Sequence, residues 1–239
     1  MYKRVLLKLS GEALKGESTT HILDMKCVEK MARMMKELYD KGIQIAVVIG
    51  AGNIWRGKLA DEIGIERAPA DYMGMLGTVM NAVCISSALK RIGVPSVVFS
   101  ALPEIPSVST TYTAEAAIKA MNENKVVFLA GGTGKPFFTT DTAATMRALE
   151  TKCDAVLMGK NGVDGVYDKD PRKNPDAKFI KTITYQEMID KGLQIMDLTA
   201  VELIKEKDVE IRVFSMADPD NFVRVAMGED IGTTCKRGE

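Results

Sequence analysis

Three short glycine-containing segments follow runs of apolar, often β-branched residues, at residues 9–12, 50–57 and 131–136. Glycine lets backbone N–H groups approach an anion closely, and the N-terminus of a following helix adds a favourable dipole. Any one of these segments is also typical of an ordinary tight turn. Three of them at the same end of a sheet favour a phosphate-rich ligand.

Charged residues stand beside each of these segments. Lys8 falls at the end of the first apolar run, where a strand would aim it at the ligand, and Arg56 in the second segment could hold phosphate oxygens with two parallel hydrogen bonds. Asp71 and Asp141 each precede an apolar helical run. Either could be a simple helix N-cap, or Asp71 could bind a sugar hydroxyl and Asp141 could orient a lysine or a metal.

Two familiar phosphate-binding patterns are excluded. Gly134-Lys135 is followed by Pro136 instead of the Ser or Thr of a Walker A loop, and Trp55 occupies the third glycine position of a dinucleotide fingerprint. The single histidine, His21, lies in a polar run and is expected to be an ordinary loop residue. Phosphoryl transfer fits, since it needs positioning and charge neutralisation more than a histidine base.

The composition narrows the class of protein further. The 239 residues hold 32 Lys+Arg and 32 Asp+Glu, and this zero net charge argues against a nucleic-acid partner. The four cysteines lie far apart and indicate free thiols in a reducing cytosol. The N-terminus does not resemble a signal peptide, so we expect a cytoplasmic protein.

Apolar periodicity places these residues on an alternating series of strands and helices. It predicts strands at 4–9, 43–49, 96–99, 125–130, 155–158 and 210–214, and helices at 24–41, 71–92, about 114–123 and about 140–151. Three further helices are predicted to begin at the capping box of residues 184–187, after Asp197 and at Pro219. The fold class is therefore α/β, a three-layer αβα sandwich with a mainly parallel central sheet, whose ligands bind beyond the carboxyl ends of the strands.

The uncharged stretch at residues 72–89 is the one segment that could be read as a membrane span. It contains several small polar residues and is at the lower length limit for spanning. We therefore expect no membrane association, but a helix buried in the core and in a subunit contact.

Five segments, in chain order, resemble the bacterial UMP kinases, which belong to the amino-acid-kinase fold family: residues 8–12, 50–57, 70–75, 132–141 and 161–167. The resemblance runs across essentially the whole chain, as far as residues 195–197 and 211–214. It implies one domain over residues 1–239, with a UMP site in an N-terminal lobe (about 1–150) and an ATP site in a C-terminal lobe (about 151–239). It also implies transfer of the ATP γ-phosphate to UMP with Mg²⁺, in pyrimidine nucleotide biosynthesis, by a homohexamer inhibited by UTP and activated by GTP.

Site residues follow from the same resemblance, position by position. The implied ATP-binding residues are Lys8, Leu9, Ser10, Gly11, Gly52, Arg56, Asn161, Tyr167 and Asp170. The implied UMP-binding residues are Gly50, Ala51, Asp71, Thr133, Gly134, Lys135, Pro136, Phe137, Phe138, Thr139 and Thr140. The implied catalytic residues are Lys8, Arg56, Asp141 and Lys160, and no protein metal ligand is assigned.

The sequence departs from the family pattern at three places. Ala51 stands where the family usually has glycine, so a positive φ there would introduce strain. Lys135 replaces the usual asparagine, which adds a cation to the predicted UMP site, and residues 17–21 lack the glycines of the segment linked to GTP activation. Of the adjacent Phe137 and Phe138, we expect one in the core and one at the pocket rim.

Two other functions remain alternatives. A kinase of the same fold could act on a carboxylate or a carbamate, although an amino-acid substrate would call for an arginine to pair with its carboxylate. A catalytically silent nucleotide-binding protein could share the scaffold, but binding alone would not need both Lys8 and Asp141.

Overall fold

The computed structural model describes residues 1–17, 20–193 and 195–238. Its main sheet has nine strands in the order β4-β3-β5-β2-β1-β6-β10-β11-β9, and β7 pairs with β8 in a separate two-stranded sheet. The strands are β1 (Arg4–Leu9), β2 (Gln44–Ile49), β3 (Ser96–Ser100), β4 (Thr110–Thr111), β5 (Val126–Ala130), β6 (Ala155–Lys160), β7 (Val166–Tyr167), β8 (Phe179–Ile180), β9 (Thr182–Thr184), β10 (Glu210–Ser215) and β11 (Thr233–Lys236). The helices are α1 (Glu12–Lys15), α2 (Met25–Asp40), α3 (Gly57–Ile63), α4 (Arg67–Arg91), α5 (Ala114–Asn122), α6 (Thr140–Glu150), α7 (Tyr185–Asp190), α8 (Leu198–Ile204) and α9 (Asp220–Ala226).

Most of the sheet is parallel. β1 pairs in parallel with both β2 and β6, and Lys8 is level with Val48 on one side and Met158 on the other. Among the described strands of this sheet, the one antiparallel pairing is that of β11 with β10, and β9 follows the direction of β11. The carboxyl ends of β1, β2, β5, β6 and β10 therefore meet at one edge, which is where the sheet must present its ligand site.

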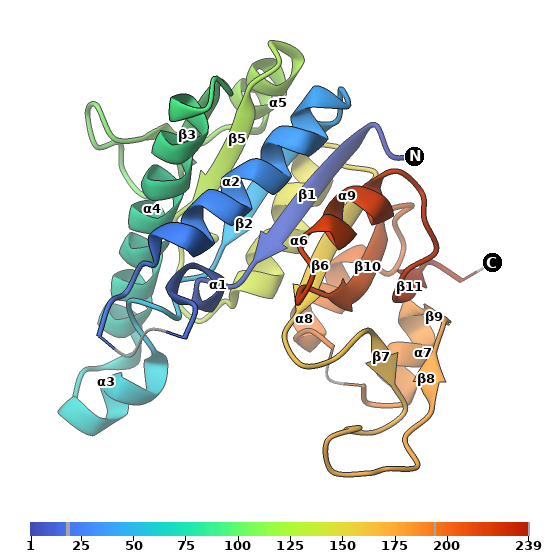
Figure 1. Cartoon of the computed structure of the whole chain (residues 1–239). Coiled ribbons are helices and arrows are strands. Elements are labelled where there is room, and N and C mark those ends of the chain that lie inside the picture. The colour runs from blue at the N-terminus through green and yellow to red at the C-terminus, as the bar shows by residue number, and fades with distance from the viewer. Residues whose placement is uncertain (18–19, 194, 239) are drawn as a thin grey trace.

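Two helical layers cover the sheet, as Figure 1 shows, and strand alternation decides which residues face each layer. Val5, Leu7 and Leu9 pack with α2, α4 and α9, whereas Leu6 packs on the opposite face with α5, α6 and α8. Lys8 has the same parity as Leu6, so β1 directs it toward the α6 side. The predicted three-layer αβα sandwich is confirmed.

The predicted elements agree closely with the observed ones, including the N-caps Asp24 and Asp197 and the capping box of Thr184 and Glu187. The prediction that the long apolar helix begins at residue 71 is wrong, because α4 begins at Arg67. Pro69 lies in its first turn, where backbone N–H groups need no helical partner, so it does not stop the helix.

Two N-cap interpretations that the sequence left open are excluded, and one predicted helix start needs correction. Asp71 lies inside α4 and is not its N-cap, and Asp141 is not the N-cap of α6, since Thr139 caps it. Pro219 precedes α9 instead of being its first residue. The observed N-caps Glu66 and Thr139 lie five and two residues before Asp71 and Asp141, and Pro219 is itself the N-cap of α9.

Helix α4 is long and apolar enough to span a membrane by length and composition alone, but 56% of its most apolar window is buried inside the protein. It packs against α2, β3 and β5 as a core helix. The exception is an outer stripe formed by Tyr72, Met73, Leu76 and Met80, which are 42%, 39%, 48% and 53% exposed.

Candidate active site

An ion pair joins the end of the first strand to the start of α6. Lys8 Nζ lies 2.6 Å from Asp141 Oδ1, and the two side chains are only 16% and 19% exposed. The parity of β1 points Lys8 to this face, and the first turn of α6 supplies the carboxylate. The structure therefore brings together two of the predicted catalytic residues.

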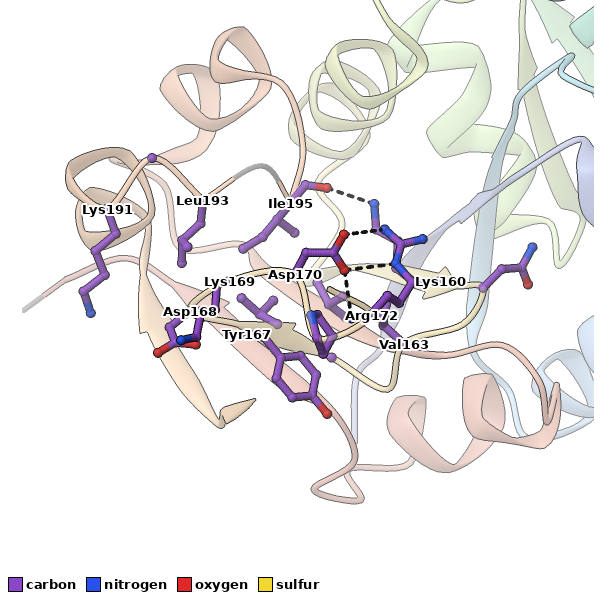
Figure 2. A pocket seen from close by; sticks show the side chains of 16 residues that line it. Lys160, Val163, Tyr167, Asp168, Lys169, Asp170, Arg172, Lys191, Leu193 and Ile195 are labelled. Atoms are coloured by element: carbon purple, nitrogen blue, oxygen red, sulfur yellow. Dashed lines mark hydrogen bonds and ion pairs between the residues drawn. The ribbon is translucent and has the colours of Figure 1, made fainter. Parts of the chain in front are cut away.

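Lys160, at the end of the neighbouring strand β6, belongs to the same cluster. Its Nζ donates a hydrogen bond to the Ile195 carbonyl at 2.9 Å, as Figure 2 shows. Burial lowers the pKa of Lys160, the charge of Lys8 lowers it further, and Asp141 acts in the opposite direction. Two cations and one carboxylate thus lie within electrostatic range of each other at the carboxyl edge of the sheet.

The N-terminus of α6 is fixed by a short network of hydroxyls. Thr139 accepts hydrogen bonds from the N–H groups of Asp141 and Thr142, and its hydroxyl donates to Asp197 at the start of α8. Thr142 also donates to Asp197 at 3.0 Å. Burial works against ionisation of Asp197, but these hydrogen bonds and one from the Ala200 N–H together lower its pKa.

A cavity of about 600 Å³, called here the acceptor cavity, lies on the β2–β5 side of this cluster. Seven predicted UMP-binding residues line it: Ala51, Asp71, Thr133, Lys135, Phe138, Thr139 and Thr140. Gly52, which was predicted to bind ATP, lines it as well. Trp55, Lys58, Asp61, Arg67 and Thr78 are among the further lining residues that the sequence did not indicate. Gly50, Gly134, Pro136 and Phe137 are close along the chain but are not part of this lining.

Asp71 projects from α4 into the acceptor cavity. Arg67 donates to both of its oxygens at 2.8 and 2.9 Å, and the Phe137 N–H donates to Oδ2 at 2.7 Å. This last bond holds Phe137 in a left-handed conformation with φ of 73°, which is strained for a bulky residue. Phe137 and Phe138 are 65% and 45% exposed, so the expectation that one of them lies in the core is wrong.

The glycine-rich loops after β1 and β2 touch each other. A Cβ on Gly11 would lie 2.4 Å from the Gly50 carbonyl oxygen, so only glycine fits there. Ala51 is buried and does not have a positive φ, and its methyl group faces Gly77, where an added Cβ would lie 2.8 Å away. The backbone strain that a positive φ would cause at Ala51 is therefore absent, and a glycine on α4 leaves space for the alanine methyl group.

A buried pair of amides supports the second loop from behind, and sequence reasoning missed it. Asn81 on α4 is fully buried and donates to the Gly50 carbonyl at 2.8 Å. It also exchanges hydrogen bonds with Asn53 at 2.8 and 3.0 Å, and Asn53 donates to the Ile22 carbonyl at 2.7 Å. An asparagine on the core face of the uncharged stretch 72–89 was the available sequence signal.

A second cavity of about 550 Å³, called here the nucleotide cavity, lies on the β6–β10 side. The predicted residues Lys160, Asn161, Tyr167 and Asp170 line it, and Figure 2 labels Lys160, Tyr167 and Asp170 among the lining side chains. An adjoining apolar cavity of about 680 Å³ shares Lys160 and Ile195 with it and reaches Asp141. Lys8, Leu9, Ser10, Gly11, Gly52 and Arg56 do not line the nucleotide cavity; they lie on and after β1 and β2.

Arg56 does not point freely into either cavity. Its guanidinium lies 2.5 Å from Glu12 Oε1, and its side chain is 67% exposed. Leu9 is buried against the opposite helical layer, so only its backbone could meet a ligand. Within residues 1–17, 20–193 and 195–238, no group of three or more His, Cys, Asp or Glu side chains could hold a metal ion.

The comparisons with known proteins agree with this site. Residues 3–215 match the amino acid kinase family. The chain is 48% identical to a uridylate kinase of Mycoplasmopsis pulmonis, covering 96% of this chain and 94% of that protein, and 49% identical to one of Streptococcus thermophilus, covering 98% and 94%. The solved structure of UMP kinase from Bacillus anthracis is 36% identical, covers 100% of this chain and 97% of its own, and superposes with a TM-score of 0.95. The chain belongs to the amino acid kinase family, and within that family to the uridylate kinases.

Proposed function

We propose that this protein transfers the γ-phosphoryl group of ATP to UMP, giving UDP and ADP, as a step in pyrimidine nucleotide biosynthesis. The observation that carries the proposal is the position of the α6 N-terminus between two cavities. Thr139 and Thr140 line the acceptor cavity, whereas Asp141 reaches the cavity that Lys160 shares with the nucleotide side. A phosphoryl group passing from one side to the other would move across a helix N-terminus, which favours anions.

Lys8 and Lys160 would neutralise the charge that spreads over the transferring phosphoryl group. Their ammonium groups need no proton transfer for this, which suits the loose transition state of phosphoryl transfer. Asp141 would keep Lys8 directed at the reacting atoms through the 2.6 Å ion pair.

Asp71 would accept a hydrogen bond from a ribose hydroxyl of UMP, in place of the bond it now receives from Phe137. The loop amides of residues 133–140 and the Thr139 and Thr140 hydroxyls would serve the uracil and the phosphate. Lys135 lines the same cavity and would add a cation toward the acceptor phosphate.

ATP would bind on the other side, with Asn161, Tyr167 and Asp170 in the nucleotide cavity and the loop amides of residues 9–11 and 52 near its phosphates. Arg56 would contribute by exchanging its Glu12 partner for a phosphate oxygen. This corresponds to an acceptor site in the lobe of about residues 1–150 and an ATP site in the lobe of about residues 151–239.

Magnesium fits this donor set. Mg²⁺ prefers oxygen ligands and in kinases is bound by one or two carboxylates together with the substrate phosphates. Asp141 could offer one carboxylate oxygen, and no larger acidic cluster among the described residues competes for the metal. When bound with ATP, the metal would supply further neutralisation of phosphate charge.

We also propose a cytoplasmic homohexamer with UTP as feedback inhibitor and GTP as activator. The exposed stripe of Tyr72, Met73, Leu76 and Met80 on α4 supports self-association, since it offers contiguous apolar side chains. A stable monomer in sedimentation at micromolar concentration would contradict it. Residues 18 and 19 of the segment linked to GTP lie outside the described residues.

The proposal is tested by measuring ADP release from ATP·Mg²⁺ with UMP, CMP, dUMP, carbamate and glutamate derivatives as acceptors. UMP should give the highest kcat/KM, and dUMP should be poorer because it lacks one ribose hydroxyl. Turnover with carbamate or a carboxylate and none with UMP would overturn the proposal in favour of the related reaction. Binding of both nucleotides with no turnover would favour a silent binding protein.

Asp71→Ala tests acceptor recognition. The substitution should raise the UMP KM about tenfold, since one hydrogen bond to a charged group is lost, and leave the ATP KM unchanged. Glu66→Ala, at the N-cap of the same helix where its side chain makes no capping hydrogen bond, is the control. An Asp71 variant with unchanged UMP dependence would show that the carboxylate serves only Arg67 and the loop.

A further inference from the structure

Arg147 is a buried arginine behind the acceptor cavity that the proposed reaction does not use directly. It lies on α6, and its side chain is only 5% exposed. One branch of the guanidinium, Nη1, contacts Glu150 Oε2 at 2.6 Å, and its Cζ lies 4.0 Å from the centre of the Tyr112 ring. The other branch, Nη2, donates to the Gly132 carbonyl at 3.0 Å.

Gly132 belongs to a turn whose backbone only glycine adopts easily. Gly131, Gly132 and Gly134 have φ values of 77°, 58° and 79°, and the Gly134 N–H closes the turn on the Gly131 carbonyl at 2.9 Å. Because glycine has wide conformational freedom, this shape must be imposed from outside. Thr78 holds one end by accepting from the Gly131 N–H at 2.8 Å, and Arg147 holds the peptide between Gly132 and Thr133 through the Gly132 carbonyl.

We propose that Arg147 is a positioning residue, which sets the orientation of the Gly132 peptide and thereby the placement of Thr133, Lys135 and Phe138 in the acceptor cavity. Thr133 follows Gly132 directly, Lys135 and Phe138 come three and six residues after it, and all three line that cavity, whereas Arg147 is not part of its lining. Arg147 thus acts on the acceptor through a main-chain carbonyl. The inference rests on the proposed function, because it assumes that the acceptor cavity binds the phosphoryl acceptor.

The two branches of the guanidinium make this role separable from fold stability. Glu150 and Tyr112 already form their own hydrogen bond at 2.5 Å, so they would remain connected if the contact to Gly132 alone were lost. Lysine at position 147 retains a cation for Glu150, but its single nitrogen cannot also reproduce the planar two-branched contact. Conversely, Glu150→Gln removes the ion pair and leaves the bond to Gly132 in place.

The experiment measures KM for UMP and for ATP, kcat and urea unfolding for wild type, Arg147→Lys, Glu150→Gln and Arg212→Lys. Arg212 is the matched control, a second buried arginine that donates to the Glu229 and Ile231 carbonyls at 3.2 and 3.3 Å and lines neither cavity. Arg147→Lys should raise the UMP KM about tenfold with the ATP KM changed less than about twofold, as expected for loss of one charge-assisted hydrogen bond. Glu150→Gln and Arg212→Lys should lower stability while both KM values stay near wild type.

The inference is overturned if Arg147→Lys loses stability as Arg212→Lys does but keeps the wild-type UMP KM. The role of the arginine would then be only structural. If Arg147→Lys does not fold, Tyr112→Leu decides: it removes the ring under the guanidinium and should raise the UMP KM about two- to threefold. An unchanged UMP KM in that variant would equally overturn it. Absence of UMP turnover in the wild type would instead be a failure of the proposed function, so the two failures are distinguishable.

Discussion

The acceptor cavity and the nucleotide cavity lie on either side of the Lys8–Asp141 pair, yet they are held by different kinds of interaction. Around the acceptor cavity, buried side chains fix backbone groups: Asn81 binds the Gly50 carbonyl, Thr78 the Gly131 N–H and Arg147 the Gly132 carbonyl. Around the nucleotide cavity, the buried Thr233 hydroxyl accepts from the Val166 N–H, but the loop of residues 168–176 is held at the surface, in part by ion pairs. Asp170 with Arg172 and Lys169 with Asp176 are examples.

This difference has an energetic meaning. Removing a buried hydrogen-bond partner leaves an unsatisfied polar group and costs more than the bond itself contributes, whereas exposed ion pairs contribute little. The acceptor cavity should therefore keep its shape without ligand. The nucleotide cavity, framed by the short strands β7 and β8, should depend more on bound ATP for its order.

The largest effect is expected where the two regions meet. Lys8→Met should lower kcat by about 10²–10³, because it removes a charge aimed at the transferring phosphoryl group, while both nucleotides still bind. Calorimetric titration of ATP and UMP together with steady-state kinetics checks this. Lys36→Met, which removes an exposed lysine of α2, should leave kcat unchanged. A Lys8 variant with near wild-type kcat would mean that Lys160 alone provides the neutralisation.

Two asparagines provide a direct comparison of the two regions. Asn81 donates to the Gly50 carbonyl at 2.8 Å beside the acceptor cavity, and Asn174 donates to the Asp170 carbonyl at 2.9 Å beside the nucleotide cavity. Asn81→Ala should lower the free energy of unfolding by about 2–4 kcal/mol, since it leaves buried polar groups unpaired, and Asn174→Ala by about 0.5–1 kcal/mol. Urea unfolding of both variants measures the difference. Equal losses would show that the two regions are not held differently.

The sequence predicted the scaffold better than the supports of the site. Apolar runs with β-branched residues and helical spacing are dictated by burial, so the predicted strands and helices lie within a few residues of their observed ends. The short elements α1, α3, β4, β7, β8, β9 and β11 were not predicted. Lys8 was correctly directed to the ligand edge because the side chains of a strand alternate. Its partner Asp141 was first open to interpretation as an N-cap, since spacing alone cannot distinguish the cap from the residues of the first turn.

The missed features depend on long-range geometry. Arg147, Asn81 and Thr78 each act on a loop 15 to 53 residues away in sequence, and no local pattern records such partners. A polar residue on the buried face of a helix was the available signal for all three. Arg56 is a different case: a guanidinium suits a phosphate, but nothing local in the sequence indicated that this one would pair with Glu12.

The alkaline decline of activity should occur at a lower pH than an ordinary lysine would give, because activity depends on the charge of Lys160. Burial and the neighbouring Lys8 lower its pKa, so its charge is lost below the pH at which an ordinary lysine titrates. In the window between the lowered folded pKa and the ordinary unfolded pKa, the unfolded chain binds more protons, and the contribution of Lys160 to stability rises with pH. Stability and activity should therefore change in opposite directions there.

The kcat–pH profile of Lys160→Arg tests this, because arginine stays charged. Its alkaline decline should move to higher pH than in the wild type, and Lys36→Arg should leave the profile unchanged. An identical decline in wild type and Lys160→Arg would assign it to another group, and the cluster would then depend on Lys8 alone for its charge.

The smallest effect is expected from the surface ion pairs of the nucleotide cavity. Arg172→Met breaks the contact with Asp170 and removes a cation that lines the cavity. Because salt screens exposed charges, the ATP KM should rise about two- to threefold at low ionic strength. At 0.5 M salt, where the Debye length is about 4 Å, the ATP KM should match the wild-type value. The urea midpoint should not change, since an exposed pair contributes little to folding. A clear loss of stability in Arg172→Met would mean that this region is built on specific contacts like the acceptor cavity, and the contrast between the two would disappear.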